Sequence, residues 1–320
     1  MWRGHIVVDG HADILHRMSG GKMDFYDPSA LLHQNYRRLK ESGVDLQVFV
    51  TFVEPDVSQG EQLYKVFASL RRFRTQVERT GVVQAVRTKS DLQAMTHSLR
   101  GGNRSLYAVL SVEGADALGG EPGVLDAWFA LGVRVVGPTW NPANCLADGV
   151  GEPRGAGLTL FGRQIVQHMR RLGMLVDVSH LSMRGVADVL ELADGPIVAS
   201  HSNAASVYAH RRNLTDDQVR AIAGAGGLVG VTFAPEFLGD GKARITDVIR
   251  HLDRLLELAG PDHVGLGSDF DGIDGTPEDL RNGSDYPQLL ERIYARYGDG
   301  VAGRVTGGNW LRILNHVLPD

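Results

Sequence analysis

Short apolar runs alternate with amphipathic stretches along the whole chain. The apolar runs are rich in valine, isoleucine and leucine, which is typical of parallel strands buried on both faces. We predict strands over residues 6–13, 44–53, 106–114, 133–140, 174–180, 196–202, 228–233 and 263–270. The amphipathic stretches predict helices over residues 61–78, 159–172, 183–193, 216–223 and 245–259. This alternation indicates an α/β protein whose parallel sheet is covered by helices.

The number of predicted strands distinguishes two α/β architectures. Eight strands within about 270 residues fit a (β/α)8 TIM-type barrel. A doubly wound open sheet is the alternative, but the phosphate-binding Gly-x-Gly-x-x-Gly sequence is absent after the first strand. We therefore predict one (β/α)8 barrel domain over residues 1–320, with its active site at the C-terminal ends of the strands.

Composition and charge argue against several classes of protein. Of the 320 residues, 43% are hydrophobic and 22% are charged, as in soluble globular proteins. The net charge of −5 and the scattered basic residues give no footprint for nucleic acid. We expect no membrane association, because no apolar run is long enough to span a bilayer and no secretory leader precedes the first strand. The single Cys145 excludes an internal disulfide and favours a cytoplasmic location.

Polar residues with metal-binding side chains close five of the predicted strands. They are His11, Asp13, Glu113, His180, His201 and Asp269. In a parallel barrel all strand ends of this kind meet at one mouth, so we expect these side chains to lie together. A core hydrogen bond would explain any one of them, but six in the same structural position favour a divalent metal site.

The absence of a cysteine cluster indicates a catalytic metal site instead of a closed structural one. His11 and Asp13 can hold one ion, His180 and His201 a second, and Glu113 can bridge both. Two ions roughly 3.5–4 Å apart activate a bridging hydroxide and polarise a substrate carbonyl. Asp269 then fits as the base that takes the proton of the water and delivers it to the leaving group.

Seven short motifs carry a resemblance to a known family. In chain order they are Asp9-Gly10-His11-Ala12-Asp13, Ser111-Val112-Glu113-Gly114, Gly173-Met174-Leu175-Val176-Asp177-Val178-Ser179-His180, Ser200-His201-Ser202, Arg211-Arg212-Asn213, Gly267-Ser268-Asp269-Phe270-Asp271-Gly272 and Gly307-Gly308-Asn309-Trp310. Over almost its whole length the chain resembles the membrane (renal) dipeptidase family, peptidase family M19 of the amidohydrolase superfamily, and its bacterial members in particular. Many amidohydrolases bridge their metals with a carbamylated lysine, but no lysine here ends a strand, and Glu113 takes that position as in the dipeptidase family.

The resemblance implies a zinc-dependent dipeptidase. It implies that two Zn²⁺ per chain are held by the five strand-end residues His11, Asp13, Glu113, His180 and His201. Manganese and cobalt also match this ligand set. The implied substrates are dipeptides, including L-Xaa-D-Xaa dipeptides, with dehydropeptides and β-lactams left open. A homodimer is expected on the resemblance alone.

The resemblance further implies that Arg212 binds the substrate's terminal carboxylate, which suits the forked guanidinium. By sequence alone Arg211 serves equally well. The chain departs from the animal members at Trp140, where they carry a histidine that contacts the substrate carbonyl. An indole has no titratable nitrogen, so oxyanion stabilisation must rely on the metal or on Asn141 or Asn144. We interpret Trp140 as a hydrophobic wall of the substrate pocket.

Two other functions remain open at this point. One is another barrel metallohydrolase, such as a deacetylase, lactonase or phosphotriesterase, which would act on substrates without a free C-terminal carboxylate. The other is a non-catalytic relative that binds metal without turnover.

Overall fold

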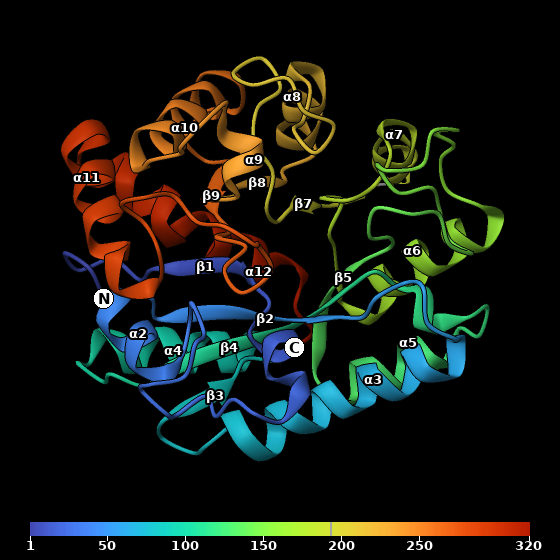
Figure 1. Cartoon of the computed structure of the whole chain (residues 1–320), viewed down its shortest axis with the longest axis horizontal. Helices are drawn as coiled ribbons and strands as arrows, with labels where there is room; N and C mark the ends of the chain where they lie inside the picture. Colours follow the sequence, from blue (N-terminus) through green and yellow to red (C-terminus); the bar gives the residue numbers. More distant parts are fainter. Residues whose placement is uncertain (193) are drawn as a thin grey trace.

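The strands run through the middle of the molecule and the helices surround them (Figure 1). The structure is a computed structural model that describes residues 1–192 and 194–320. The strands are β1 Val8–Ala12, β2 Leu46–Phe52, β3 Val83–Ala85, β4 Leu106–Glu113, β5 Val133–Gly137, β6 Leu175–Val176, β7 Val198–Ala199, β8 Leu228–Val231 and β9 Val264–Leu266. The α-helices are α1 Ile14–Arg17, α2 Tyr36–Ser42, α3 Gln59–Arg72, α4 Lys89–Arg100, α5 Gly123–Ala130, α6 Leu160–Leu172, α7 Met183–Glu191, α8 Asp216–Gly224, α9 Pro235–Leu238, α10 Ile245–Ala259, α11 Tyr286–Gly303 and α12 Asn309–Val317.

Within the described ranges the strands form two curled parallel sheets. The larger has the order β1-β2-β4-β5-β6, with β3 added beside β4, and the smaller has the order β7-β8-β9. Every strand pair in both sheets is parallel. The α/β class and the helical cover are as predicted. The continuous ladder of eight strands that a closed barrel would have is replaced by these two sheets.

The two sheets approach each other at two seams, each marked by an isolated parallel bridge. At one seam Asp177, just after β6, pairs with Val198 in β7. At the other, Ala12 in β1 pairs with Phe270, beyond β9. The backbone N–H of Val178 donates to the Val198 carbonyl at 2.7 Å. Across the second seam, the Asp13 N–H donates to the Phe270 carbonyl at 2.8 Å.

At each seam a buried aspartate accepts hydrogen bonds from a serine on the other side of the seam. Asp9 accepts hydrogen bonds from the Ser268 backbone N–H at 2.8 Å and from its hydroxyl at 2.6 Å. Asp177 accepts from the Ser200 backbone N–H at 3.0 Å and from its hydroxyl at 2.5 Å. These carboxylates accept from backbone N–H groups that would otherwise form hydrogen bonds between strands. The strands at the seams therefore end earlier than the apolar pattern predicts.

Three predicted strands are consequently too long. The strands predicted over 174–180, 196–202 and 263–270 are observed as β6, β7 and β9, and the polar residues that follow them lie in turns. The short β3 was missed because Val83-Gln84-Ala85 contains no apolar run. The helix predicted over 183–193 begins at Met183 and ends at Glu191, and residue 193 lies outside the described residues.

The inner faces of the strands share one apolar cluster with two helices. Leu46, Val48 and Val50 of β2 belong to this cluster, whereas Phe49 between them belongs to the outer core beneath the helices. This is the period-two alternation of a strand that is covered on both faces. Leu92, Met95 and Leu99 of α4 and Trp310, Ile313 and Leu314 of α12 complete the inner cluster.

Trp310 is the largest side chain of this inner cluster. It is fully buried, and its indole N–H donates to the Leu266 carbonyl at 3.0 Å. Gly10 in β1 lies against the indole, and a Cβ atom there would overlap the ring. Gly10, in the first sequence motif, therefore leaves the space that Trp310, in the last motif, occupies. Among the described residues, no helix combines the length and apolar composition needed to cross a membrane.

Candidate metal centre

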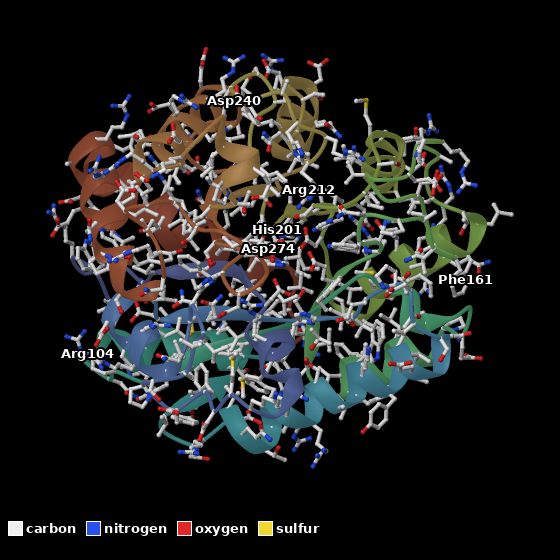
Figure 2. All side chains as sticks on the ribbon, in the orientation of Figure 1. Arg104, Phe161, His201, Arg212, Asp240 and Asp274 are labelled. Carbon is white, nitrogen blue, oxygen red and sulfur yellow. The ribbon has the colours of Figure 1, made fainter. Side chains whose placement is uncertain are left out.

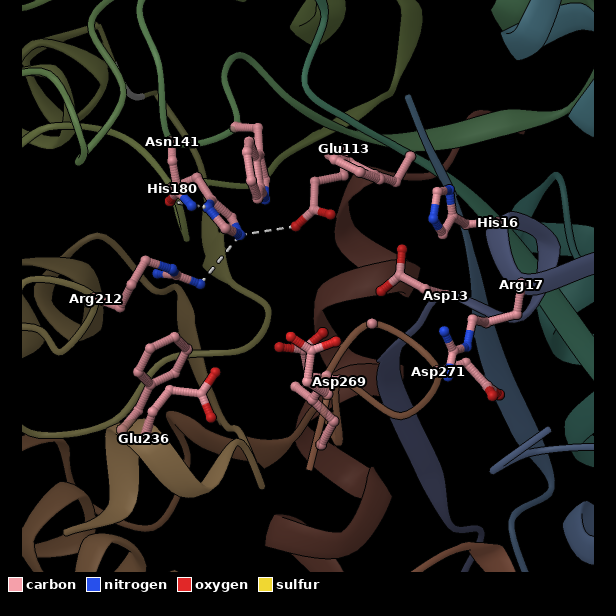
Figure 3. Close-up of a pocket in the computed structure, with 16 residues that line it drawn as sticks. Asp13, His16, Arg17, Glu113, Asn141, His180, Arg212, Glu236, Asp269 and Asp271 are labelled. Carbon is pink, nitrogen blue, oxygen red and sulfur yellow. Dashed lines mark hydrogen bonds and ion pairs between the residues drawn. The ribbon is translucent and has the colours of Figure 1, made fainter. Parts of the chain in front are cut away.

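The six strand-end residues gather at the carboxyl ends of the strands. Figure 2 labels His201 near the centre of the molecule, and Figure 3 shows Asp13, Glu113, His180 and Asp269 facing one another. His11 lies in β1, Asp13 precedes α1, Glu113 ends β4, and His180, His201 and Asp269 lie in the turns after β6, β7 and β9. Parallel strands bring these ends together. The register of β1 shifts between Asp9 and Ala12, so Asp13 meets His11 through the turn into α1 and not through simple strand alternation.

One carboxylate oxygen, Oε1 of Glu113, forms the centre of the cluster. The Nε2 atoms of His180, His201 and His11 lie 2.9, 3.3 and 3.6 Å from it. Asp13 Oδ2 lies 3.4 Å from His11 Nε2. Glu113 thus belongs to two groups whose ligand atoms lie within 4.8 Å of one another, one with His11 and Asp13 and one with His180 and His201.

Several buried polar atoms of the cluster have no hydrogen-bond partner among the described residues. They are His11 Nε2, Asp13 Oδ1 and Glu113 Oε1. Unpaired buried polar atoms are rare in proteins, because each costs the free energy of its lost hydration. Nitrogen and oxygen donors of this kind are the ligands that divalent transition metals prefer. The donor set therefore fits a divalent metal centre, with Glu113 between two groups of ligands.

The carboxylates hold a proton on His11 when no metal neutralises them. Burial lowers the pKa of His11, but the carboxylates of Glu113 and Asp13 outweigh burial and raise it to about 10. The site therefore attracts positive charge, which a divalent cation would supply in place of the proton.

In contrast to His11, His180 and His201 have lowered pKa values. Burial, assisted by the Arg212 guanidinium, lowers the pKa of His180 to about 4. Burial and the neighbouring His11 hold the pKa of His201 well below its ordinary value. Burial opposes ionisation of Glu113, but His180 and His11 outweigh it and lower the pKa of its carboxyl group. Two neutral imidazoles thus face one carboxylate, which is the protonation state that metal binding requires.

Asp269 faces this cluster from the turn after β9. Its φ angle of 63° lies in the left-handed region, which aspartate tolerates better than most residues. The turn is held by its N–H, which donates to the His11 carbonyl at 3.0 Å. Burial raises the pKa of Asp269 well above its ordinary value; His11 opposes this rise and Asp13 adds to it. A Cβ atom on Gly272 would clash with both Asp13 and Asp269, so the glycine lets the two carboxylates approach each other.

A cavity of about 310 Å³ opens beside the cluster. Figure 3 shows Asp13, Glu113, His180, Arg212 and Asp269 around it. The remaining lining residues are His16, Arg17, Phe52, Trp140, Asn141, Glu236, Phe237, Asp271, Gly272, Ile273 and Asp274. Both cations and carboxylates line the cavity, so it suits a small zwitterionic molecule.

The two neighbouring arginines occupy different environments. Arg212 is buried, lines the cavity, and donates to the carbonyls of Ser179 and of His201, the latter at 3.3 Å. Its Nη2 atom lies 3.2 Å from His180 Nε2, and its Nε has no hydrogen-bond partner among the described residues. Arg211 is exposed and lies outside this lining. The geometry therefore separates two residues that sequence alone leaves equivalent.

The segment after β5 gives the cavity an apolar wall and one polar contact. The Trp140 ring lies 5.1 Å from Phe52 and 6.1 Å from His180 between ring centroids. Asn141 Oδ1 lies 2.9 Å from His180 Nδ1. Asn144 lies outside the cavity lining, and its amide nitrogen donates to Asp116 at 3.1 Å and to the Pro138 carbonyl at 2.8 Å. Asn144 thus joins the loop after β5 to the turn after β4.

Sequence reasoning missed several residues of the cavity, including His16, Arg17 and Glu236. His16 and Arg17 lie in the one-turn helix α1, and Glu236 lies in α9. Both helices are four residues long, and elements of this length leave no periodic pattern in a sequence. The available signal was only their position directly after predicted strands.

The fold and the cluster define a class: parallel α/β proteins with a buried histidine–carboxylate group able to hold divalent metal at the strand ends. A model of the membrane dipeptidase family (peptidase family M19) matches residues 1–318, and the chain belongs to this family. An uncharacterised protein from the pqqA 5′ region of Klebsiella pneumoniae is 40% identical over 227 residues, covering 67% of this chain and 83% of that protein. Dipeptidase aclJ of Aspergillus oryzae is 37% identical over 219 residues, covering 66% of this chain but only 52% of the fungal protein.

Solved structures extend the similarity over the whole fold. A crystal structure of dipeptidase AC, a metallopeptidase of family M19, has a TM-score of 0.90 and 28% identity, and covers 99% of this chain and 100% of that one. A metallopeptidase from Rhodobacter sphaeroides, solved with a phosphinate mimic of the dipeptide L-Ala-D-Ala, has a TM-score of 0.88 and 27% identity, covering 98% and 99%. The predicted family membership is thereby confirmed.

Proposed function

We propose that this protein is a dipeptidase that works with two divalent metal ions, zinc in the first instance. The observation that carries the proposal is the convergence of three imidazole Nε2 atoms on Glu113 Oε1. His11 and Asp13 would hold one ion and His180 and His201 the other, with Glu113 shared. When bound, the ions would polarise the scissile carbonyl and activate the attacking water.

In this proposal Asp269 moves the proton. It faces the ligand cluster from the turn after β9, and its raised pKa suits a group that accepts a proton and later returns it. It would take the proton of the attacking water and deliver it to the leaving amine. Its left-handed backbone and its bond to the His11 carbonyl hold it in place for both transfers.

Arg212 gives the site its preference for a free C-terminal carboxylate. The guanidinium lines the cavity and keeps an unpaired Nε, so it retains donor capacity for an anionic group. Trp140 and Phe52 would form the apolar wall beside the substrate, and Asn141 would orient His180 as well as border the substrate. The L-Ala-D-Ala mimic bound by the Rhodobacter sphaeroides metallopeptidase supports L-Xaa-D-Xaa dipeptides as the first substrates to test.

We further propose that the two sheets act as one closed eight-stranded barrel, with the short β3 outside it. The bridges Asp177–Val198 and Ala12–Phe270 support this, because they join the larger sheet to the smaller one on both sides. Closure would place all the proposed ligands around one mouth of a single domain.

The test is a panel of L,L-, L,D- and D,D-dipeptides assayed with zinc-loaded and chelator-treated protein. We expect turnover of at least one dipeptide class, loss of that turnover on chelation, and recovery on adding metal. N-acetylated amino acid amides, which lack the terminal carboxylate, serve as the matched substrates and should not be hydrolysed. Turnover that survives complete metal removal, or hydrolysis of the amides alone, would overturn the proposal.

A further inference from the structure

The hydroxyl of Ser200 contacts two of the proposed histidine ligands at once. Its Oγ lies 2.8 Å from His201 Nδ1 and 3.1 Å from His11 Nδ1. The same Oγ lies 2.5 Å from Asp177 Oδ2. Ser200 is 1% exposed and Asp177 5% exposed, so water does not compete strongly for these contacts. One serine thus links a buried carboxylate to an imidazole from each half of the cluster.

The donor count at Ser200 decides the arrangement, because the fourth neighbour of its Oγ, the Ser179 hydroxyl at 3.2 Å, directs its own proton to Asp177 Oδ1. A hydroxyl group has one proton to donate and two lone pairs, whereas an ionised carboxylate only accepts. The Ser200 proton therefore points to Asp177, and both lone pairs face the two imidazoles. The Nδ1 atoms of His11 and His201 must then each carry a proton. An unprotonated ring nitrogen would direct its lone pair at a lone pair of the Ser200 oxygen. A ring with its proton on Nδ1 keeps a lone pair on Nε2, in His11 once metal has displaced its second proton. Nε2 is the atom that faces Glu113 in both residues.

Asp177 is itself fixed by other donors. Its Oδ1 accepts from the Ser179 hydroxyl at 2.6 Å, the Ser179 N–H at 3.1 Å and the Ser200 N–H at 3.0 Å. Oδ2 is left for the Ser200 hydroxyl. An amide with its N–H₂ toward Ser200 would occupy a hydroxyl lone pair and turn the Ser200 proton toward an imidazole. The opposite orientation would direct the N–H₂ at the N–H groups of Ser179 and Ser200. The carboxylate is therefore required for the arrangement at Ser200.

The third histidine has an independent partner. His180 Nδ1 lies 2.9 Å from Asn141 Oδ1, and its Nε2 faces Glu113. All three imidazoles thus have an outside partner on Nδ1 and present Nε2 to the centre, but only His11 and His201 share a partner. The Nε2 atoms of His180 and His201 lie 2.9 Å apart, a separation that suits two lone pairs directed at one cation.

We propose that Ser200, oriented by Asp177, is a positioning residue that sets the tautomer of one histidine ligand in each half of the metal centre. The proposal rests on the proposed metal-dependent function. It assigns the Asp177-Ser200 pair a second role besides binding the seam between β6 and β7. Partners that orient metal-ligating histidines typically contribute 10- to 100-fold to metal affinity.

The chain supplies a matched control at the other seam. Ser268 binds Asp9 as Ser200 binds Asp177, but its hydroxyl contacts the His11 carbonyl oxygen at 3.2 Å instead of a ring nitrogen. Ser200→Ala and Ser268→Ala therefore remove equivalent aspartate–serine bonds, and only the first removes the imidazole acceptor.

The first measurement is the affinity for Zn²⁺, by competition with a chromophoric chelator. We expect Ser200→Ala and Asp177→Asn to weaken it by roughly 10- to 100-fold, and Ser268→Ala to leave it unchanged while lowering the thermal midpoint as much as Ser200→Ala does. Equal Zn²⁺ affinity of Ser200→Ala and Ser268→Ala would overturn the positioning role. Failure of the wild-type protein to bind Zn²⁺ would instead overturn the proposed function.

The second measurement needs no metal. In ¹⁵N-histidine-labelled protein freed of metal, the imidazole nitrogen shifts of His201 should report the Nδ1–H tautomer, and Ser200→Ala should lose that preference. A His201 that carries its proton on Nε2 in the wild-type protein, or a tautomer unchanged in Ser200→Ala, would contradict the proposal even if both proteins were fully folded.

Discussion

Glu113 Oε1 lies 2.9 Å from His180 Nε2, at the carboxyl ends of two strands that are separated in the larger sheet by β5. The same oxygen is buried and has no hydrogen-bond partner among the described residues. Burying a carboxylate here costs the free energy of its lost hydration, unless a positive charge beside it offsets that cost. We therefore expect metal binding to depend most on Glu113.

Glu113→Gln should abolish tight metal binding. The amide removes the shared negative charge and directs an N–H₂ group toward the imidazoles, so we expect the Zn²⁺ affinity to fall by roughly 100-fold or more, beyond the loss typical of outer partners. Metal content after dialysis measures this. Glu236→Gln is the control, because Glu236 lines the same cavity outside the ligand groups. Equal metal content of the two variants would contradict the prediction.

Asp269→Asn should separate chemistry from metal binding. The amide cannot carry the proton, so kcat should fall by roughly 10²- to 10⁴-fold. Asp269 also forms a third group with His11 and His201, but both Glu113-centred groups stay complete in this variant, and metal content should be retained. Steady-state kinetics together with metal analysis check the two halves of the prediction. A variant with full metal and near-normal kcat would remove Asp269 from the mechanism.

Arg212→Lys should weaken recognition of the substrate carboxylate. An ammonium group cannot reproduce the two-pronged contact of a guanidinium, so kcat/KM for dipeptides should fall by roughly 10- to 100-fold. Arg211→Lys, at the exposed neighbouring position, should leave kcat/KM unchanged. Thermal unfolding of both variants controls for the carbonyl contacts of Arg212. If kcat/KM fell in Arg211→Lys and stayed unchanged in Arg212→Lys, Arg211 would be the residue that binds the substrate carboxylate.

The stability of the metal-free protein should pass through a maximum near neutral pH. The pKa of His11 is raised to about 10, above the ~6.5 of an unfolded histidine, so its contribution is complete below pH ~6.5 and is lost as the pH rises toward 10. The pKa of His180 is lowered to about 4, so its contribution is complete above pH ~6.5 and is lost as the pH falls toward 4.

Bound metal should change one limb of this profile in particular. Metal replaces the proton on His11, so the loss of stability between pH ~6.5 and 10 should flatten in zinc-loaded protein. Chemical denaturation across this pH range, with and without metal, measures both profiles. Metal-free protein whose stability stays constant from pH 6.5 to 10 would argue against the raised pKa of His11.

Gly10→Ala should destabilise the fold through Trp310. A Cβ atom at this position overlaps the indole, and overpacking of this kind costs about 1–3 kcal/mol in the free energy of unfolding. Trp310→Phe removes the part of the ring that is overlapped, so the double variant should be more stable than the sum of the single changes predicts. Additive effects in urea denaturation would show that the two residues do not interact.

Sequence predicted which residues share one end of the sheet better than it predicted the lengths of the strands. Parallel strands share one direction, so His11, Glu113 and His201 could be assigned to one end of the sheet from their position in the chain alone. The lengths of β6 and β7 could not be predicted, because Asp177 takes backbone N–H groups that the apolar pattern assigns to a ladder.

The contacts that orient the ligands were outside the reach of sequence pattern. Ser200 and His11 are 189 positions apart, and Asp177 and Ser200 are 23 apart. Nothing in the local spacing of serines and aspartates indicates which imidazole they meet. The same applies to the choice between Arg211 and Arg212, which depends on the direction in which the chain turns after β7.

The position of α12 has a consequence for the order of folding. Trp310, Ile313 and Leu314 complete the apolar cluster on the inner faces of the strands, yet they lie in α12, which follows every described strand along the chain. During synthesis the strands emerge from the ribosome before the segment that fills their interior. The nascent chain must therefore keep Val8, Val48 and their neighbours without their final packing partner until residues 309–317 are released, and this interval is when it most needs protection from aggregation.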